Sequence, residues 1–312
     1  MVAMLDKELK PAGVRIPCAT SNLGSGFDTI GLAFDRYLEV WFEPGGDRLN
    51  LMRRGTLEGL FEDDEHDLIA ISFLEVLEEN GIIPRGNLTA TSGIPVSRGL
   101  GSSAAALLAG RELGKLVLGE PRDDDGLFEH AYIQEGHGDD AAPCLHGGLK
   151  SVVLGPLGPL IIDLPLSSEV GFAYAAPATG VSTKEAREAL PDRVGHAVAA
   201  RSLGRITALT TGLAEGDPVL LRVGVEDELH VPYRLPLILD AEEAIRIAYE
   251  SGAWAVTISG AGSGLVAMCD KNDADNIACV MREVFIDGSP ETECVGFTVI
   301  PDRKGLQRLP ED

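Results

Sequence analysis

A glycine-rich segment that runs directly into a helix is the part of this sequence best suited to chemistry. It consists of Pro95, Val96, Ser97, Arg98, Gly99, Leu100, Gly101, Ser102, Ser103, Ala104 and Ala105. The first N–H groups of a helix lack internal partners and carry partial positive charge, and glycines let the backbone approach an anion closely. With the hydroxyls of Ser102 and Ser103, the segment predicts a phosphate-binding nest that requires no lysine. Taken alone, the pattern is also compatible with an ordinary joint between a loop and a helix.

The two common nucleotide-binding motifs are missing from this chain. The pattern G-x-x-x-x-G-K-[ST] occurs nowhere, and the glycines of 95–105 do not match G-x-G-x-x-G. A Walker loop and a dinucleotide-binding turn are therefore excluded as explanations of the segment.

The composition narrows the class of partner. The 312 residues include 49 acidic and 26 basic side chains, which gives a formal net charge of −23 and an isoelectric point near 4.6. Nucleic-acid binding needs a basic face, so we expect neither nucleic acid nor an anionic membrane as a partner. Five cysteines without C-x-x-C spacing favour a reducing compartment, and residues 1–10 lack the apolar core of a secretory signal. We expect a cytoplasmic protein.

Hydrophobic periodicity places the segment among interleaved helices and strands. The pattern predicts strands at 37–43, 87–91, 149–162 with Gly-Pro turns, 171–176, 254–259, 265–269 and 293–300. It predicts helices at 67–80, 102–118, 123–135, 182–191, 240–252 and 273–285. The irregular order favours an α+β architecture over a doubly wound parallel sheet. The acidic run 62–67 is interpreted as a solvated loop, with a cation site as the less favoured alternative.

The length exceeds that of a single small core and predicts two domains. A stretch rich in Gly and Pro at 157–165 is the candidate boundary. We therefore assign residues 11–160 to a first domain and residues 161–312 to a second.

Three segments together resemble the signatures of the GHMP kinases. The run P-x-x-x-G-L-G-S-S-A-A at 95–105 resembles the phosphate loop, 17–32 (PCATSNLGSGFDTIGL) the N-terminal signature, and 258–267 (ISGAGSGLVA) the C-terminal glycine loop. Within that family, EGHGDDAAP at 135–143, STKEAR at 182–187 and HVPYR at 230–234 resemble the homoserine kinases. The resemblance spans residues 14–300. It implies a first domain like domain 2 of ribosomal protein S5 and a ferredoxin-like second domain.

The resemblance also implies an ATP-dependent kinase. The first domain would bind ATP, with segment 95–105 holding the β- and γ-phosphates. Ser102 and Glu129 would hold Mg²⁺, which prefers hard oxygen ligands and keeps several waters. Without the resemblance, Glu129 would be interpreted as an exposed helix carboxylate.

The substrate implied by the resemblance is homoserine, phosphorylated on its γ-hydroxyl in threonine biosynthesis. Arg187 and Arg234 would bind its carboxylate, because a guanidinium grips two oxygens in one plane. Asp28 would meet its ammonium group. The other implied substrate contacts are Asn22, His137, Thr183, Asp140 and Gly262.

One residue departs from the family pattern and leaves alternatives open. The family usually has D-N after E-G-H-x, whereas this chain has Asp139 and Asp140. An ionised carboxylate only accepts hydrogen bonds, whereas an amide also donates them. Asp140 could bind the substrate ammonium, or it could act as a general base toward a different small hydroxylated metabolite. A non-catalytic sensor of nucleotide is a further hypothesis. Relatives are often dimers, so a homodimer is also an open expectation.

Overall fold

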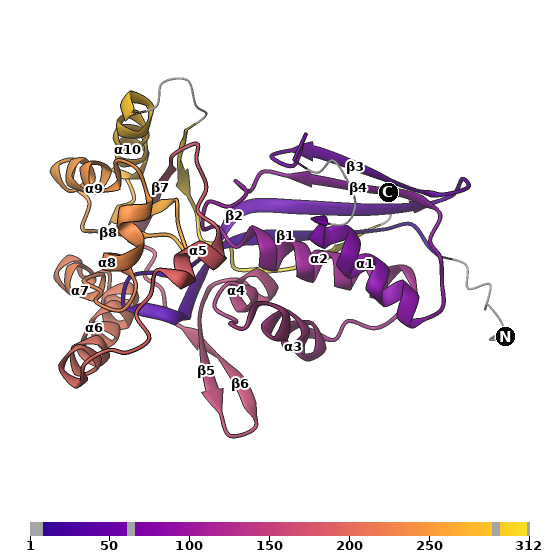
Figure 1. The fold of residues 1–312 in the computed structure, drawn as a ribbon, viewed down its shortest axis with the longest axis horizontal. Coiled ribbons are helices and arrows are strands. Elements are labelled where there is room, and N and C mark those ends of the chain that lie inside the picture. Colours follow the sequence, from indigo (N-terminus) through magenta and orange to yellow (C-terminus); the bar gives the residue numbers. More distant parts are fainter. Residues whose placement is uncertain (1–8, 61–65, 289–293, 311–312) are drawn as a thin grey trace.

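Two β-sheets lie beside one another in the computed structural model, which describes residues 9–60, 66–288 and 294–310 (Figure 1). The strands of the first sheet are β1 (Ala12–Asn22), β2 (Gly26–Pro44), β3 (Leu49–Gly55), β4 (Gly86–Ser92), β5 (Leu149–Gly155), β6 (Gly158–Leu164) and β11 (Gln307–Leu309). Their order is β11-β1-β2-β4-β3, with β5 paired to β2 and β6 paired to β5. Only β3 and β4 run parallel. The long strand β2 therefore carries partners at both of its ends.

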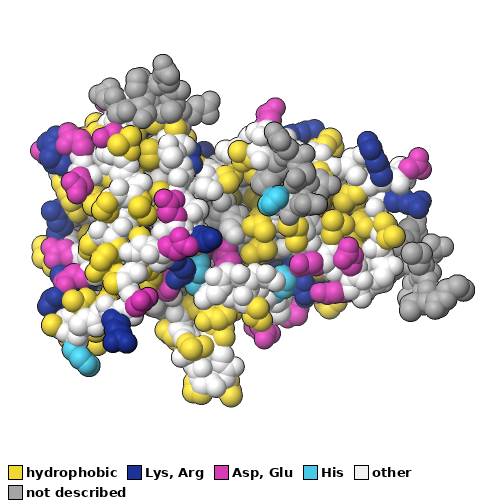
Figure 2. Space-filling view, viewed as in Figure 1, with side chains coloured by type: hydrophobic (Ala, Val, Ile, Leu, Met, Phe, Trp, Pro, Cys, Tyr) yellow, Lys and Arg dark blue, Asp and Glu magenta, His cyan; other side chains and the backbone are white. Residues whose placement is uncertain are grey.

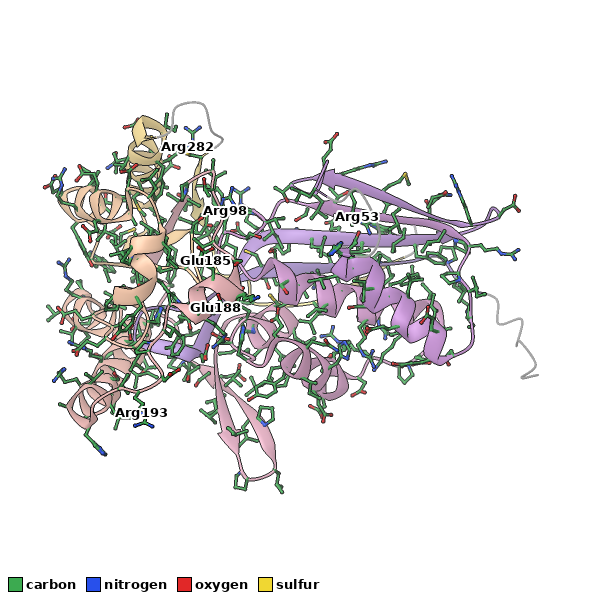
Figure 3. All side chains as sticks on the ribbon, in the orientation of Figure 1. Arg53, Arg98, Glu185, Glu188, Arg193 and Arg282 are labelled. Atoms are coloured by element: carbon green, nitrogen blue, oxygen red, sulfur yellow. The ribbon has the colours of Figure 1, made fainter. Side chains whose placement is uncertain are left out.

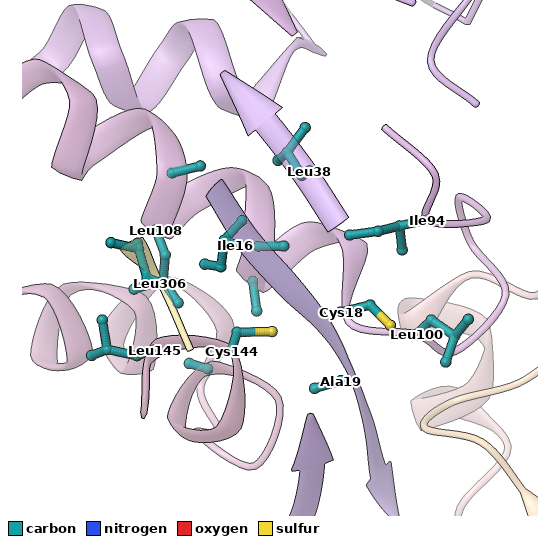
Figure 4. Close-up of a cluster of buried hydrophobic side chains, with 14 of the residues drawn as sticks. Ile16, Cys18, Ala19, Leu38, Ile94, Leu100, Leu108, Cys144, Leu145 and Leu306 are labelled. Atoms are coloured by element: carbon teal, nitrogen blue, oxygen red, sulfur yellow. The ribbon is translucent and has the colours of Figure 1, made fainter. Parts of the chain in front are cut away.

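Four helices belong to the first sheet: α1 (Leu68–Glu79), α2 (Ser102–Val117), α3 (Asp124–Glu135) and α4 (Ala141–His146). The apolar stripe of α2 meets the inward side chains of β1 and β2. In Figure 4, Ile16, Leu38, Leu108, Leu145 and Leu306 come together in this core, each at most 3% exposed. The core fixes α2, and with it the glycine-rich segment that leads into α2.

The second sheet has the order β10-β7-β9-β8. Its strands are β7 (Val170–Ala176), β8 (Ala255–Ile258), β9 (Leu265–Asp270) and β10 (Val295–Val299). They pair antiparallel, and counted along the chain this is the order 4-1-3-2 of a ferredoxin-like sheet. The helices are α5 (Thr183–Glu188), α6 (His196–Glu215), α7 (Pro218–Gly224), α8 (Val231–Arg234), α9 (Ala241–Glu250) and α10 (Ala274–Gly288), with a short 3₁₀ helix η2 (Leu235–Leu237) after α8. The predicted α+β class and ferredoxin-like second domain are confirmed.

The helix signals in the sequence were accurate where capping residues were present. Asp67 and Asp123 cap α1 and α3, and Ser182 caps α5 by accepting a hydrogen bond from the Glu185 amide. No element was predicted for 196–237, which forms α6, α7, α8 and η2. In α6 the apolar spacing is confined to Leu203, Ile206, Leu209 and Leu213, and Gly195 before the helix provides no side-chain cap, so the start of the helix carries no capping signal.

The division into 11–160 and 161–312 needs correction at both ends of the second domain. Strand β6 pairs with β5 through a tight hairpin and belongs to the first sheet, so the predicted boundary cuts through a strand. The strand β11 also returns to the first sheet, where Gly13 pairs with Leu309. The strand β11 has only three residues, which is too few to show a hydrophobic period. It can be recognised as a strand only from its pairing with β1.

The acidic run 62–67 is only partly visible, because its residues 62–65 lie outside the described residues. Asp67 is 2% exposed rather than solvated. Its carboxylate caps α1 and accepts a 2.6 Å hydrogen bond from Arg53 Nε. The side chain of Arg53 lies over the first sheet (Figure 3). Among the described helices, none has both the length and the apolar character that a membrane crossing requires.

A buried ion pair attaches β11 to α2. Arg308 Nε lies 2.5 Å from Glu112 Oε1, and the Glu112 side chain is fully buried. Removing one partner of a buried pair leaves an uncompensated charge. We predict that Arg308→Ala lowers the free energy of unfolding by about 3 kcal/mol, as measured by urea denaturation. The exposed Arg193 (Figure 3) provides the control: Arg193→Ala should have little effect, and equal losses in both variants would contradict the assignment.

Candidate active site

The three segments that resemble family signatures meet at the junction of the two sheets. The hydroxyls of Thr20 and Ser259 lie 2.8 Å apart, and Ser259 Oγ donates a 2.6 Å hydrogen bond to the carbonyl of Gly99. Asn22 Nδ2 donates a 2.8 Å bond to the carbonyl of Gly260. A Cβ on Gly99 would lie 1.8 Å from the Ser259 carbonyl oxygen, so only glycine allows this approach. The loops therefore form one hydrogen-bonded unit.

A cavity of about 300 Å³ opens where these loops meet. It collects polar and charged side chains from both halves of the chain. Its walls are formed by Ser21, Asn22, Asp28, Ser97, Gly99, Gly101, Ser102, Ser103, Gln134, Glu135, His137, Asp139, Asp140, Val181, Thr183, Arg187, Arg234, Ala261 and Gly262. All eight predicted substrate contacts are in this set.

The N-terminus of α2 faces this cavity. Gly101 precedes the helix with a left-handed φ of 60° and offers no side-chain cap. The first intrahelical bond runs from the Ala105 amide to the Gly101 carbonyl, so the amides of the preceding three residues point beyond the helix. This geometry agrees with the predicted anion nest.

The eleven residues of segment 95–105 divide into three groups. Ser97, Gly99, Gly101, Ser102 and Ser103 line the cavity. The side chains of Leu100, Ala104 and Ala105 are at most 1% exposed and belong to the core, so only their backbone can serve a ligand. Pro95, Val96 and Arg98 lie outside the cavity wall, and Arg98 (Figure 3) accepts a 2.5 Å bond from Tyr174 through its carbonyl. A nucleotide-binding role for these three residues stays a prediction.

Three carboxylates and a histidine form one wall of the cavity. His137 Nδ1 lies 2.7 Å from Asp139 Oδ1. Burial lowers the pKa of His137, but the Asp139 hydrogen bond and the charges of Asp139, Asp140 and Glu135 outweigh it and raise the pKa to about 9. His137 is therefore an imidazolium at neutral pH. Burial also raises the pKa of Glu135, whose Oε2 has no hydrogen-bond partner among the described atoms.

Asp140 occupies the point where the α2 terminus meets this acidic wall. Its Oδ2 accepts a 3.1 Å bond from Ser21 Oγ, while its buried Oδ1 has no partner among the described residues. Oδ1 lies 3.0 Å from the position that a Cβ on Gly101 would occupy. Burial, followed by the charges of Asp139 and Glu135, raises the pKa of Asp140 well above its ordinary value. The neutral acid is favoured at this position.

The assignment of Glu129 as a magnesium ligand is wrong. Its side chain is exposed on α3 and does not line the cavity. Glu129 and Glu135 lie six residues apart, which places them roughly 120° apart around the helix, on different faces. Glu135, at the end of α3, lines the cavity together with Ser102 and Ser103 of the α2 terminus. The motif E-G-H contained this residue, and only the helix phase identifies it as the one facing the cavity.

Arg187 and Asp28 form an ion pair across the cavity. The guanidinium donates two hydrogen bonds of 3.0 and 2.9 Å to the two carboxylate oxygens, and this contact raises the pKa of Arg187. Asp28 has a φ of 51°, and the side-chain oxygen of Asn22 accepts a 2.9 Å bond from its amide. Asn22 therefore positions Asp28 while its own amide group is already engaged on both sides.

Arg234 is a buried cation without a carboxylate in ion-pair range among the described residues. It is 2% exposed and donates to the carbonyls of Ala186 and Gly260 at 3.2 and 3.4 Å. Its guanidinium also lies 5.1 Å from the Phe27 ring centroid. Burial and the charge of Arg187 lower the pKa of Arg234. A buried positive charge without a negative partner is costly, so a guanidinium that lines a cavity in this way favours binding of an anionic group.

His230 fixes the orientation of Arg234. The imidazole is fully buried, with Nε2 2.9 Å from the Gly24 carbonyl and Nδ1 3.4 Å from Arg234 Nη1. Burial lowers the pKa of His230. The neutral ring then donates through Nε2 to the carbonyl and accepts from Arg234 through Nδ1. His230 belongs to the motif HVPYR, but its position in that motif does not predict this role.

Two family models and several known proteins are similar to this chain. The family model "GHMP kinases N terminal domain" matches residues 68–148, and "GHMP kinases C terminal" matches residues 209–287. A homoserine kinase of Microchaete diplosiphon is 34% identical over 276 residues, covering 87% of this chain and 89% of the relative. One of Deinococcus radiodurans is 32% identical over 263 residues, covering 84% and 85%. The crystal structure of homoserine kinase from Cytophaga hutchinsonii superposes with a TM-score of 0.81 at 26% identity, covering 99% of this chain and all of that one.

The fold, the uncapped α2 terminus and the matched domains define a small-molecule kinase of the GHMP class. The similarity to these relatives covers 87% and 84% of the chain, which is more than the two family models match. The chain belongs to the homoserine kinase family of the GHMP kinases.

The charge state of Asp140 predicts a pH-dependent effect on stability. A carboxyl whose pKa is higher in the folded than in the unfolded chain binds more protons when folded, so it destabilises the fold as pH rises above its ordinary value of 3.8. We expect Asp140→Asn to raise the melting temperature at pH 8 by about 3 °C or more, because it removes this repulsion. The difference should shrink as pH falls toward that ordinary value. Melting curves across pH measure it, and an increase that is independent of pH would contradict the explanation.

Proposed function

We propose that this chain transfers the γ-phosphoryl group of ATP to the side-chain hydroxyl of homoserine, giving O-phosphohomoserine. One observation carries the proposal. The buried Arg234, which has no carboxylate partner among the described residues, lines the same cavity as the Arg187–Asp28 ion pair. Two guanidinia and a carboxylate match the carboxylate and ammonium of an α-amino acid. The opposite wall is the phosphate-binding terminus of α2, so the substrate hydroxyl and a nucleotide phosphate would share one space.

The N-terminus of α2 supplies the phosphate site. Its free amides and the hydroxyls of Ser102 and Ser103 can bind the β- and γ-phosphates without a lysine. The unpartnered Oε2 of Glu135 and the hydroxyl of Ser102 fit the hard oxygen ligands that Mg²⁺ requires, and Mg²⁺ bound there would neutralise charge on the phosphates. His137, as an imidazolium, reduces the repulsion between the acidic wall and the nucleotide.

Substrate binding would exchange one ion pair for two. In the structure Asp28 and Arg187 satisfy one another. A bound α-amino acid can separate Arg187 from Asp28. Its carboxylate would then contact Arg234 and Arg187, and its ammonium group would contact Asp28. A ligand with only one of the two charges would leave a partly buried protein charge without a partner, which costs free energy. The site therefore selects zwitterions.

The reaction requires positioning more than covalent participation. The hydroxyl oxygen attacks the γ-phosphorus, its bond to that phosphorus forms, the bond to the bridging β,γ-oxygen breaks, and ADP leaves with the displaced electron pair. As the phosphate ester forms, the hydroxyl proton passes to an oxygen of the transferred phosphoryl group and from there to solvent. Asp140 accepts a hydrogen bond from Ser21, and its raised pKa favours proton uptake, which would let it donate as the usual amide does.

A panel of alcohols tests the function through ADP release. We predict activity with homoserine, and weaker or no activity with threonine, serine, mevalonate, shikimate and pantoate. The single-charge analogues 4-hydroxybutyrate and 3-aminopropanol should lose about 100-fold or more in kcat/KM, because each leaves one protein charge unpaired. Turnover confined to an alcohol that is not an amino acid would reject homoserine as the substrate. Binding of ATP without turnover of any alcohol would favour a sensor.

Glu135, proposed as the magnesium ligand, and the exposed Glu129 lie on the same helix and can be compared directly. Glu135→Gln should lower kcat by about 100-fold or more, because it removes a negative ligand beside the transferred phosphoryl group. Glu129→Gln, which removes the same charge from the exposed face of α3, should leave kcat unchanged within about threefold. Steady-state kinetics at saturating ATP and homoserine measure both. A larger loss in the Glu129 variant would restore the original assignment.

A further inference from the structure

Three consecutive carbonyl groups of the segment before α2 are held by hydrogen bonds from both sheets. Tyr174 Oη, on β7, donates a 2.5 Å bond to the carbonyl of Arg98. Ser259, after β8, and the amide of Ala19, on β1, donate bonds of 2.6 and 3.2 Å to the next two carbonyls. None of these three donors lines the active-site cavity. The segment is therefore anchored on the side away from the ligands.

The anchored carbonyls determine where the following amides point. In a trans peptide unit the carbonyl of one residue and the N–H of the next point in opposite directions. The amides of Gly99, Leu100 and Gly101 are thereby directed away from the anchors, and none of them has an acceptor among the described residues. The left-handed φ values of 72° at Gly99 and 60° at Gly101 give the alternating backbone of an anion-binding nest. Both glycines line the cavity.

The hydroxyl of Tyr174 has no other partner among the described residues. The side chain is fully buried, and its ring stacks on Phe297 with the centroids 5.1 Å apart. Phenylalanine would supply this packing without the cost of burying a polar atom. Burial raises the pKa of Tyr174 well above its ordinary value, so the hydroxyl keeps its proton and donates it to the Arg98 carbonyl.

Gly264 leaves the space that this hydrogen bond needs. A Cβ on Gly264 would lie 2.2 Å from Tyr174 Oη and 2.5 Å from the Arg98 carbonyl oxygen. Gly264 and Ser259 both belong to the C-terminal glycine loop at 258–267. That loop therefore supports two neighbouring peptides of the phosphate-binding segment, one directly and one by making room for Tyr174.

Tyr174 has no surface through which it could contact a ligand itself. It is 0% exposed and does not line the cavity. Figure 2 instead shows charged and histidine side chains gathered on the surface between the two halves of the molecule. Any effect of Tyr174 on a bound nucleotide must therefore pass through the peptide that joins Arg98 to Gly99.

We propose that Tyr174 is a positioning residue for phosphoryl transfer, whose hydroxyl orients the Arg98–Gly99 peptide so that the Gly99 amide points toward the nucleotide phosphates. The inference rests on the proposed function, because it takes the ligand of the nest to be the triphosphate of ATP. Donors that are already oriented need no rearrangement when the phosphates bind. Without the hydroxyl this peptide can turn, and the first amide of the nest loses its direction.

Binding of a non-hydrolysable imido analogue of ATP, with Mg²⁺ and without any alcohol, tests this role by calorimetry. Tyr174→Phe should raise the dissociation constant of the analogue about tenfold, because the hydrogen bond that orients one phosphate donor is lost. In steady-state kinetics the KM for ATP should rise, while the KM for homoserine should stay within about twofold. A purely structural role would lower the melting temperature and leave the dissociation constant and both KM values unchanged.

Tyr249→Phe is the matched control. The Tyr249 hydroxyl also bonds the backbone, accepting a 3.0 Å hydrogen bond from the Val256 amide, and Tyr249 does not line the cavity. This variant should bind the analogue within about twofold of the wild type. Gly264→Ala is a second test, because its methyl group would displace the same hydrogen bond and should weaken binding in the same direction.

The possible outcomes separate this role from the proposed function. Equal dissociation constants for the wild type and Tyr174→Phe would overturn the positioning role and leave the proposed function intact. If Tyr174→Phe lost its circular dichroism signal, unchanged binding by a folded Gly264→Ala would overturn the role. A wild-type chain that does not bind the analogue would overturn the nucleotide site and, with it, the role of Tyr174.

Discussion

The structure depends on the hydrogen bonds that join three distant loops around Ser259. Its hydroxyl contacts Thr20 at the end of β1 and the carbonyl of Gly99 before α2, while the neighbouring Gly260 accepts from Asn22. These bonds attach the second sheet to the first at the place where the phosphate-binding terminus opens. If the loops moved independently, the arginines of the second half would have no fixed distance from the anion nest of the first. Transfer between two bound ligands needs that distance to be fixed.

Several charged side chains of the cavity have an oxygen atom without a hydrogen-bond partner, or no ion-pair partner, among the described residues, and a bound ligand would supply one. Glu135 and Asp140 each keep a buried oxygen without a partner, and Arg234 is buried without a carboxylate among the described residues. Unsatisfied groups of this kind are costly in a folded protein and concentrate where a ligand will bind. Glu135, Asp139 and Asp140 line the same cavity as the N-terminus of α2 and the guanidinia of Arg187 and Arg234. A protein with a large negative charge thereby keeps two guanidinium groups and a free helix N-terminus in one cavity.

Much of this site could be predicted from the sequence. The glycines and serines of 95–105 specify an anion nest through backbone geometry, and capping residues such as Asp67 and Ser182 specified helix starts. All eight predicted substrate contacts line one cavity, because each was anchored by a motif with its own spacing. Prediction failed where the signal depended on helix phase or on weak periodicity. Glu129 and Glu135 are equivalent in type and only the rotation of α3 separates them, while α6 shows apolar spacing over only part of its length and begins without a capping side chain.

By itself the sequence determined the local conformations: the left-handed glycines, the helix caps and the family to which its motifs belong. Tertiary structure alone decided which groups meet. The Arg187–Asp28 pair joins residues 159 positions apart, and Arg308 reaches Glu112 across 196 positions. Local conformation follows from sterics and hydrogen bonding between near neighbours, which short patterns encode. Contacts between distant residues follow from how the whole core packs, and no short pattern contains that information.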